Sequence, residues 1–393
     1  MRYDMNLYDG PFDCFKNREK DIELRLNDEK RQKIRSGDRI FFHRLNDRHD
    51  ILKCEVSDVR CYSDFRQLYA KEDLFRCGYK VGDTPSFEDM YAYYSKEAIE
   101  RCGVLAIEVK VSDEPYWMDG HVHLEHGPLT KEYVLEFVRE AERKGLDELD
   151  ILDHSHRFRE FRSCYDHLRI YPQQDEWLNR PSKFADSLED YDSLIREIRK
   201  LDLPLRVCFG LEVCYTEDTE ELLREILKDG KYDFLTGSVH SVGHILYDMP
   251  FSEELLKEKY TEEEVCHLYY ERLINCASSG LFARIGHPDQ IKVTVSDSGI
   301  DLTEDFRKLA RVLSEKQVIA ENNTGCHWRY GIEEIGNSEK LLEIFKEHNV
   351  RMIAASDAHD PQNTGLFVKE ATQRIRQSEI EGEEEDDAGK FCE

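Results

Sequence analysis

The chain has 393 residues, which is enough for two domains that each bury an apolar core. Its formal net charge of −28 would repel a polyanion at long range, so the sequence argues against general binding of duplex DNA or of an anionic membrane. No apolar run approaches the roughly 18 residues that span a bilayer. The 12 cysteines form no C-x-x-C pair and no export signal is recognisable, so a cytoplasmic protein with reduced thiols is predicted.

A small, mostly β domain is predicted over residues 1–111. Its pattern is two short alternating segments, then a helical stretch and a final strand, at residues 38–43, 50–56, 86–101 and 103–111. The pattern breaks at Pro115, which cannot donate a hydrogen bond to a strand ladder. Residues 112–116 are therefore predicted to be a linker.

Residues 117–375 alternate short apolar runs with longer amphipathic segments, as parallel strands joined by crossover helices do. One helix is well marked: Thr130 is a candidate N-cap, Gly145 ends the segment, and apolar residues recur at helical spacing between them. Residues 376–393 are acidic and lack apolar periodicity, which predicts a disordered, solvated tail.

Seven strands are predicted in this second part, at residues 117–123, 149–154, 207–213, 234–240, 283–287, 318–323 and 352–359. Six of them end in residue types that bind metals: His121 and His123, His154, Glu212, His240, His287, and Asp357 with His359. The carboxyl ends of parallel strands meet at one mouth of a barrel, so these side chains are expected to converge. Imidazoles and carboxylates in one place predict a metal-dependent enzyme.

The segment 157–183 follows His154 and is rich in arginine and aromatic residues. A long loop at such a place often acts as a lid or a substrate wall. The alternative is a surface loop and helix with solvated arginines.

Ordered motifs in this second part resemble those of the PHP (polymerase and histidinol phosphatase) superfamily, most closely its histidinol-phosphate phosphatase branch. They are DGHVHLEHGPL, ILDHSHRF, GLEVCY, GSVH, IGHPD, ENNTG and ASDAHDP. The resemblance implies a distorted (β/α)7 barrel that holds two or three divalent ions of zinc, iron or manganese. It assigns His121, His123, Glu212 and Asp357 to the first ion, Glu212, His240 and His287 to the second, and His126, His154 and His359 to the third.

The implied activity is hydrolysis of a phosphate monoester by a metal-bound hydroxide. L-histidinol phosphate, which would give L-histidinol and phosphate in histidine biosynthesis, is the first substrate expected. Catalytic roles are predicted for Glu212, Arg157, His156 and His244, and substrate binding for Arg157 and Arg329. Arg157 would bind phosphate or instead pair with an acid on a neighbouring loop. Residues 326–330, CHWRY, are more aromatic than that branch leads us to expect, which leaves the substrate open.

The N-terminal part resembles the ASCH domain, a PUA-like β-barrel often linked to RNA. The pattern G-x-K-x-x-E-x-R is matched at Lys20, Glu23 and Arg25, while Arg18 stands where the glycine is usual. The resemblance implies a cleft for RNA or a nucleobase-like ligand. The alternative is an exposed cluster of ion pairs with little energetic consequence.

Two other functions are compatible with the sequence. The same metal site would serve a nucleotide or a nucleic-acid end, with the ASCH-like domain contacting RNA. A non-catalytic RNA-binding protein with structural metals is a different class, which is disfavoured because structural zinc sites normally close all four positions.

Overall fold

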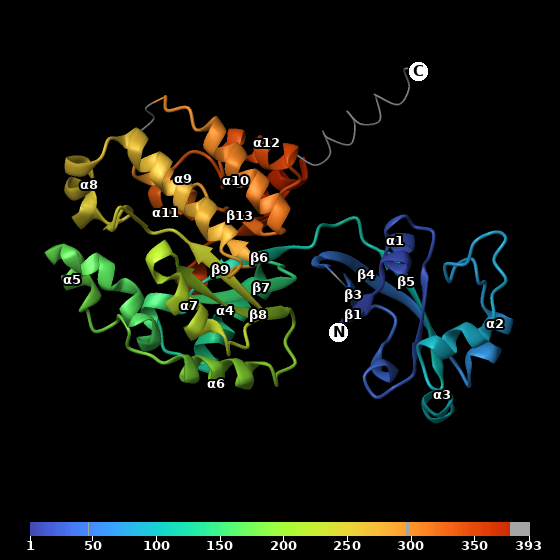
Figure 1. Cartoon of the computed structure of the whole chain (residues 1–393). Helices are drawn as coiled ribbons and strands as arrows, with labels where there is room; N and C mark the ends of the chain where they lie inside the picture. The colour runs from blue at the N-terminus through green and yellow to red at the C-terminus, as the bar shows by residue number, and fades with distance from the viewer. Residues whose placement is uncertain (46, 296–298, 378–393) are drawn as a thin grey trace, which may run out of the picture. The chain divides into compact units, whose positions relative to one another are not determined.

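The computed structural model describes residues 1–45, 47–295 and 299–377. The chain divides into two compact units, Met1–Tyr116 and a second that begins at Trp117 (Figure 1). The acidic tail predicted over residues 376–393 lies outside the described residues from position 378 onward. Within the described ranges, no helix is both long and apolar enough to cross a bilayer.

The first unit is built on a five-stranded sheet with the order β1-β3-β4-β5-β2. β1 and β3 are parallel, and the other neighbouring strands are antiparallel. The strands are β1 (Arg2–Leu7), β2 (Ile22–Leu26), β3 (Arg39–Arg44), β4 (Asp47–Tyr62) and β5 (Val104–Val111). Alternate residues of β5 enter two different apolar clusters, Leu105 and Ile107 in one and Val104 and Ala106 in the other. The sheet is therefore covered on both faces.

Helices α1 (Asp9–Lys16), α2 (Phe65–Lys71) and α3 (Lys96–Cys102) belong to this unit, with the 3-10 turns η1 (Arg31–Lys33) and η2 (Phe87–Ala92). The prediction of one helical stretch over residues 86–101 is wrong. Ser86 caps η2, and Ser95 separately caps α3 by accepting a hydrogen bond from the backbone N–H of Ala98. Each serine starts a new helix, so the stretch is split in two.

The second unit is a nearly closed barrel of seven parallel strands in the order β6-β7-β8-β9-β12-β13-β14. The strands are β6 (Met118–Val122), β7 (Glu148–His154), β8 (Arg206–Cys214), β9 (Phe234–Ser238), β12 (Arg284–Ile285), β13 (Ile319–Asn323) and β14 (Met352–Ala355). A parallel bridge between Val122 and Ala358 joins the two ends of the sheet. The predicted barrel fold is confirmed.

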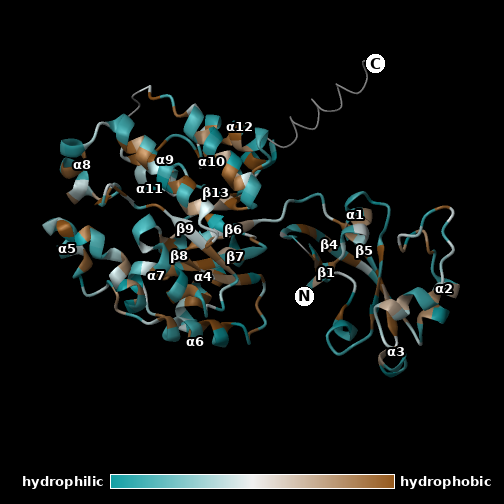
Figure 2. Cartoon of the chain, in the orientation of Figure 1, coloured by the Kyte–Doolittle hydropathy of each residue, from teal (hydrophilic) through white to brown (hydrophobic). Residues whose placement is uncertain are grey.

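Helices surround this barrel, and Figure 2 shows hydrophilic and hydrophobic residues alternating along them. They are α4 (Lys131–Arg143), α5 (Pro172–Leu178), α6 (Leu188–Ile198), α7 (Glu220–Leu227), α8 (Glu253–Lys259), α9 (Glu262–Ser278), α10 (Thr303–Lys316), α11 (Gly325–Tyr330) and α12 (Glu339–Glu347). Thr130 caps α4, and Val134, Phe137, Val138 and Ala141 form its buried stripe. These features of α4 are as predicted.

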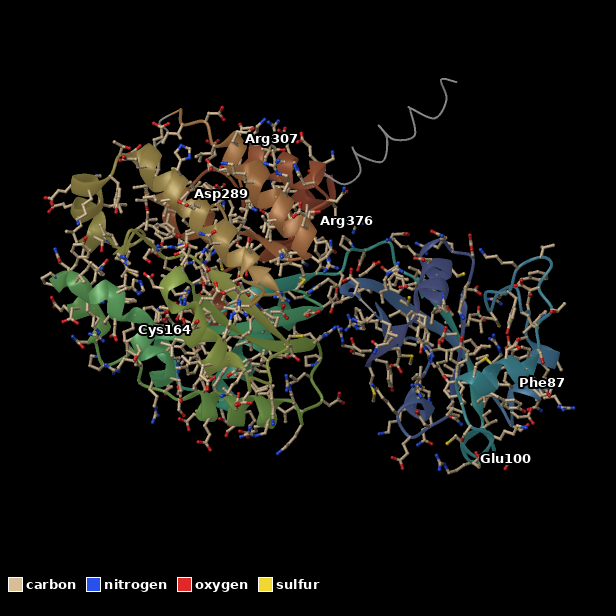
Figure 3. All side chains as sticks on the ribbon, viewed as in Figure 1. Phe87, Glu100, Cys164, Asp289, Arg307 and Arg376 are labelled. Atoms are coloured by element: carbon tan, nitrogen blue, oxygen red, sulfur yellow. The ribbon has the colours of Figure 1, made fainter. Side chains whose placement is uncertain are left out.

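The arginine-rich segment after β7 forms η3 (Ser155–Arg157), η4 (Arg159–Ile170) and α5. Its aromatic residues Phe158, Phe161 and Tyr165 are buried, and so is Cys164, which Figure 3 labels. The segment is therefore anchored in the core of the barrel unit through its apolar side chains, and it is not a loosely solvated loop.

Candidate metal centre

Histidines and acids from the ends of six strands, β6, β7, β8, β9, β12 and β14, meet at the carboxyl mouth of the barrel. His121 is the penultimate residue of β6 and His123 follows the strand, His154 ends β7, Glu212 lies in β8, and Asp357 follows β14. The Nε2 atoms of His121 and His123 are 2.8 Å apart, and Nε2 of His123 is 3.2 Å from Oδ1 of Asp357. This is the convergence expected at the carboxyl ends of parallel strands.

Glu212 is at the centre of the cluster. Its Oε2 lies 2.5 Å from Nδ1 of His154, and its Oε1 lies 2.8 Å from Nε2 of His287 and 3.3 Å from Nε2 of His240. The side chain is completely buried. A carboxylate at this depth is stable only when positive charge or hydrogen-bond donors surround it.

Two of the converging residues have unusual backbone conformations. His287 has φ 30° and Asp357 has φ 59°, in the left-handed region that side chains other than glycine rarely adopt. Such conformations cost about 1–3 kcal/mol each and persist where the surrounding structure enforces them. The loops after β12 and β14 are thus held in strained shapes that aim these two side chains into the cluster.

The charges in the cluster are strongly coupled. Burial alone would raise the pKa of Glu212, but the charges of His154 and His240 outweigh it and hold the pKa well below its usual range. Burial likewise opposes ionisation of Asp357, whose pKa Arg329 and His123 nevertheless keep well below normal. Both carboxyl groups are therefore ionised, and the buried site carries negative charge among imidazole rings.

His121 is held from behind by Glu321, whose two carboxylate oxygens each lie 2.9 Å from its Nδ1. Burial would lower the pKa of His121, but Glu321 and Glu212 raise it well above the usual value. A carboxylate on the far ring nitrogen fixes the orientation of a metal-binding histidine and makes it a stronger ligand.

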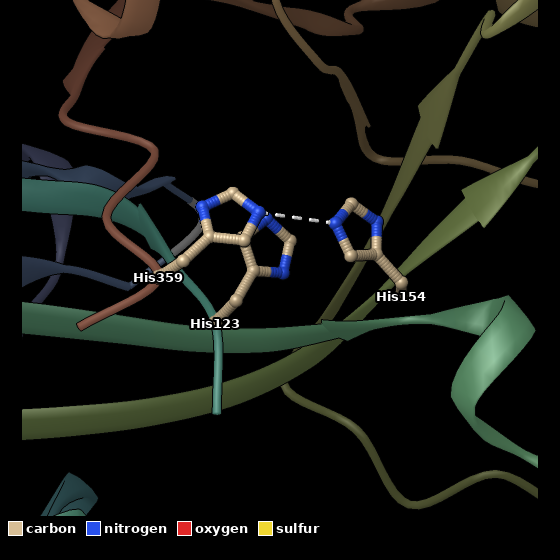
Figure 4. Close-up of side chains that lie close together, drawn as sticks. All are labelled: His123, His154 and His359. Atoms are coloured by element: carbon tan, nitrogen blue, oxygen red, sulfur yellow. Dashed lines mark hydrogen bonds between the residues drawn. The ribbon is translucent and has the colours of Figure 1, made fainter. Parts of the chain in front are cut away.

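The donor set fits divalent cations. Oε2 of Glu212 is buried and lies close to Nδ1 of His154, but it accepts no well-oriented hydrogen bond within the described residues. Several groups of three ligand atoms lie within 4.8 Å of one another, among them His121 with His123 and Asp357, and His154 with Glu212 and His240. Figure 4 shows a third, His123 with His154 and His359. Mixed nitrogen and oxygen donors suit zinc, iron or manganese better than calcium.

The predicted ligands that converge here are His121, His123, His154, Glu212, His240, His287, Asp357 and His359. His126 does not join them. Its side chain is 52% exposed, and its Nδ1 is 3.2 Å from Oδ2 of Asp360. It lies on the turn after His123, at the rim of the cavity.

A cavity of about 340 Å³ opens above the cluster. Its wall combines histidines and acids with the aromatic rings of Trp177, Trp328 and Tyr330, and with the cations Lys183 and Arg329. Arg329 pairs with Oδ2 of Asp357, so this predicted substrate-binding residue does reach the site. His156 also lines the cavity, with its Nε2 3.2 Å from Nζ of Lys183.

Arg157 and His244 are not among the residues that line the cavity. Arg157 donates to Asp153 and to Asp186 at 2.6 Å each, and to the carbonyl oxygen of Gly127 at 2.8 Å. These hydrogen bonds occupy the guanidinium. Arg157 therefore pairs with acids, the alternative that the sequence left open, and does not bind phosphate in this arrangement. His244 lies in the turn between β10 (Ser241–Val242) and β11 (Ile245–Leu246).

Sequence reasoning missed several residues of the site. Glu321 lies in β13, the strand to which no ligand was assigned, and it contacts His121 of the histidine and carboxylate cluster. Glu125 continues the alternation of His121 and His123, a period-two signal that was visible in the sequence. Lys183 lies in the segment 157–183 that was predicted to wall the substrate, whereas Asp248 and Gln290 reach the cavity only through the path of the chain around them, which residue order does not indicate.

The first unit holds its own cavity, of about 370 Å³, lined by Lys20, Glu23 and Arg25 together with tyrosines. Oε2 of Glu23 is 3.1 Å from Nζ of Lys20, and its Oε1 is 3.2 Å from Nη2 of Arg25. Lys20 and Glu23 are buried, so the alternative of an exposed ion-pair cluster is wrong. Arg18 has φ 61°, which explains why glycine is usual at its position in the ASCH pattern.

Comparison with known proteins agrees with this geometry. The sequence profile of the PHP domain matches residues 119–325, more than half of the chain. The chain belongs to the PHP domain family. The profile of the ASCH domain matches residues 5–112, so the PHP domain follows an ASCH domain in this protein.

Two curated relatives of this PHP protein are called probable histidinol-phosphatase. The one from Deinococcus radiodurans is 28% identical over 207 residues, which cover 51% of this chain and 76% of the relative. The one from Schizosaccharomyces pombe is 22% identical over 246 residues, which cover 58% and 76%.

Solved structures show the same fold. The histidinol phosphate phosphatase from Lactococcus lactis, complexed with zinc, L-histidinol and phosphate, has a TM-score of 0.52 at 19% identity and covers 67% of this chain and 94% of its own. The putative histidinol phosphatase from Listeria monocytogenes has a TM-score of 0.50 at 19% identity and covers 63% and 97%.

Arg157→Ala is expected to destabilise the PHP unit without changing phosphate affinity or metal content. Removal of the guanidinium leaves the buried Asp153 carboxylate without its cation, which costs about 3–5 kcal/mol. Trp117, Trp177 and Trp328, the three tryptophans of the chain, all lie in this unit, so their fluorescence during urea unfolding measures the loss. Arg159→Ala, at a side chain that is 59% exposed, is the matched control. Unchanged stability of Arg157→Ala together with weaker inhibition by inorganic phosphate would instead support phosphate binding by Arg157.

Proposed function

We propose that the ester hydrolysed by this metal-dependent phosphatase is L-histidinol phosphate, giving L-histidinol and phosphate. The observation that carries the proposal is the buried Glu212 carboxylate among the ring nitrogens of His154, His240 and His287 at the barrel mouth. Two curated relatives called probable histidinol-phosphatase, and a similar fold that holds L-histidinol and phosphate, support the choice of substrate.

Two or three zinc, iron or manganese ions would be held by this chain. His121, His123 and Asp357 would hold the first, Glu212 would be shared with a second held by His240 and His287, and His154 and His359 would contribute to a third. Bound ions of this kind lower the pKa of water and neutralise charge that develops at phosphorus. Glu321 would keep the ring of His121 turned toward its ion.

Lys183 takes the place that the sequence suggested for Arg157. Its side chain is 12% exposed, its Nζ lies 4.4 Å from the centre of the Trp177 ring, and it faces the cavity. Burial and then the charge of Lys183 lower the pKa of His156 well below its usual range. The imidazole is therefore neutral, and His156 does not act as a general acid. In this proposal Lys183 binds phosphate oxygens, and His156 holds the ammonium in place.

Asp248 and Gln290 provide a place for the amino alcohol. Nε2 of Gln290 donates to Oδ2 of Asp248 at 3.5 Å, whereas Oδ1 of Asp248 and Oε1 of Gln290 are buried and have no donor among the described residues. Both residues line the cavity together with Trp328 and Tyr330. Two acceptors without donors, beside aromatic faces, suit a leaving group that carries an ammonium or another N–H donor.

Glu212→Gln is expected to abolish turnover and to reduce metal loading together, because the neutral amide removes the charge shared by the ions. Loss of an outer partner of a metal ligand already costs 10–100-fold, so a decrease in kcat/KM of at least about 100-fold is expected here. Phosphate release and elemental analysis measure the two effects. Glu221→Gln, at an exposed position on α7, is the matched control. Retained activity with full metal content would contradict the assignment.

Asp248→Asn is expected to lower the preference for an ammonium-bearing ester. The ratio of kcat/KM for L-histidinol phosphate to that for phenyl phosphate should fall by about 10-fold or more, the effect of losing one charge-assisted hydrogen bond. Asp202→Asn, on an exposed loop that precedes β8 at the opposite end of the barrel, is the control. An unchanged ratio would show that Asp248 does not select the leaving group.

A nucleotide or a nucleic-acid end remains the second candidate substrate for the same metal site. A phosphate-release screen with L-histidinol phosphate, nucleoside monophosphates and 3′- or 5′-phosphorylated oligonucleotides compares the candidates directly. Rapid nucleotide turnover without hydrolysis of L-histidinol phosphate would reverse the order. The non-catalytic alternative is not retained, because the protein is a phosphatase.

The cavity of the ASCH domain is proposed to bind RNA or a nucleobase-like ligand. Lys20, Glu23 and Arg25 offer buried donors and acceptors, while Tyr69 and Tyr79 offer aromatic faces on which a base can stack. The proposal is independent of the phosphatase site.

Glu23→Gln is expected to weaken binding of a nucleoside or a short single-stranded RNA to the full chain by about 10-fold, because the amide cannot replace a charge-assisted hydrogen bond. Titration calorimetry with the four nucleosides and an RNA oligonucleotide measures the effect, with the exposed Glu29→Gln as the control. Absence of any binding to the unaltered protein would refute the site.

A further inference from the structure

We infer that Glu125, and not His126, completes the ligand set of the third ion together with His154 and His359. The assignment rests on the metal centre proposed above and changes one of its ligands from an imidazole to a carboxylate. It concerns the order of residues directly after β6, where HLEH places an acid and a histidine side by side.

Three ligand atoms form a compact triangle at this position. Oε1 of Glu125 is 3.3 Å from Nε2 of His359 and 3.7 Å from Nε2 of His154, and the two Nε2 atoms are 3.3 Å apart. Metal bonds of about 2.0–2.2 Å in a tetrahedral arrangement separate ligand atoms by about 3.3–3.6 Å. Two of the three separations lie in this range and the third, 3.7 Å, is slightly longer, so the three atoms suit three corners of one coordination shell.

The chain path explains why Glu125 points inward. His121 and His123, two apart at the end of β6, lie on one side of the chain, and Glu125 is the next alternate residue, in the turn that follows the strand. Val122 and Leu124 between them are completely buried. The backbone N–H of Gly127 then donates to the carbonyl oxygen of Leu124 at 3.0 Å and closes a turn. The buried Leu124 fixes the turn, and Glu125 continues the row of ligands.

His126 directly follows Glu125 and is not one of these alternate residues. Its side chain is 52% exposed, whereas that of Glu125 is 20% exposed. Its Nε2 lies 4.0 Å from Oε1 of Glu125, and its Nδ1 bonds Asp360 at the rim. Within the described part of the chain, His126 belongs to none of the triads of ligand atoms that lie within 4.8 Å of one another, whereas Glu125 belongs to one with His154 and His156.

A competing role for Glu125 is to balance the charge of Lys183, whose Nζ is 4.0 Å from its Oε2. That distance is longer than the separations of Oε1 from the two histidines. The two oxygens can therefore serve different partners, with Oε1 facing the ion and Oε2 facing the ammonium. One carboxylate would thus join the third ion to the cation proposed to bind phosphate.

The experiment compares metal stoichiometry in Glu125→Gln, Glu125→Ala and His126→Ala. Each full-length protein is saturated with Zn²⁺ or, separately, with Mn²⁺, freed of excess ion by gel filtration and analysed for metal per chain. The two Glu125 variants are expected to hold about one ion fewer than the unaltered protein, and His126→Ala the same number. Circular dichroism checks that each variant is folded, and the near-isosteric Glu125→Gln covers the case in which the alanine variant fails to fold.

Loss of an ion from His126→Ala with full loading of Glu125→Gln would overturn the assignment, as would an unaltered protein that saturates at two ions. Lys183→Met distinguishes metal binding by Glu125 from charge balance with Lys183. If Glu125 binds the ion, removal of the ammonium should leave the metal stoichiometry unchanged. Loss of an ion from Lys183→Met would count against direct ligation by Glu125. The metal count needs no turnover, so it is distinct from a failure of the phosphatase proposal, which phenyl phosphate hydrolysis tests separately.

Discussion

The site depends on one electrostatic constraint, which is that the fully buried carboxylate of Glu212 must be ionised inside the barrel mouth. An isolated buried charge is very costly, so the fold must supply positive charge or metal ions around it. Three histidines at the ends of three different strands meet this requirement within 3.3 Å. Their convergence links the ends of β7, β9 and β12 to β8, which makes this cluster part of the architecture as well as of the chemistry.

The barrel also closes next to this cluster of side chains. The bridge between Val122 and Ala358 joins the segments that carry His123 and Asp357, so the last strand is brought beside the first at the level of the cluster. The positive φ values of His287 and Asp357 show that the backbone accepts strain to aim these side chains. The rigid barrel holds that strain, because its strands are buried and hydrogen-bonded on both sides.

The arginine-rich segment after β7 lies beside the site, as predicted, but its Arg157 does not have the predicted role of binding phosphate. Arg157 lies close to the site, but Asp153 and Asp186 use its guanidinium to fix the loop that carries His156 and leads to Lys183. The cation of this segment that faces the cavity is therefore Lys183, while Arg157 determines where the loop runs. The buried aromatic residues of η4 complete this anchoring.

The sequence by itself determined the seven strands, the capped helix α4 and the convergence of the predicted site residues other than His126, because apolar periodicity and the positions of strand ends follow directly from residue order. Only the tertiary structure decided which of Glu125 and His126 faces the cluster, where Arg157 finds its partners, and that Lys20 and Glu23 are buried in the ASCH domain. Those outcomes depend on turns and on contacts between residues far apart in the chain. Local periodicity carries no information about such contacts, and the path of each loop in space settles them.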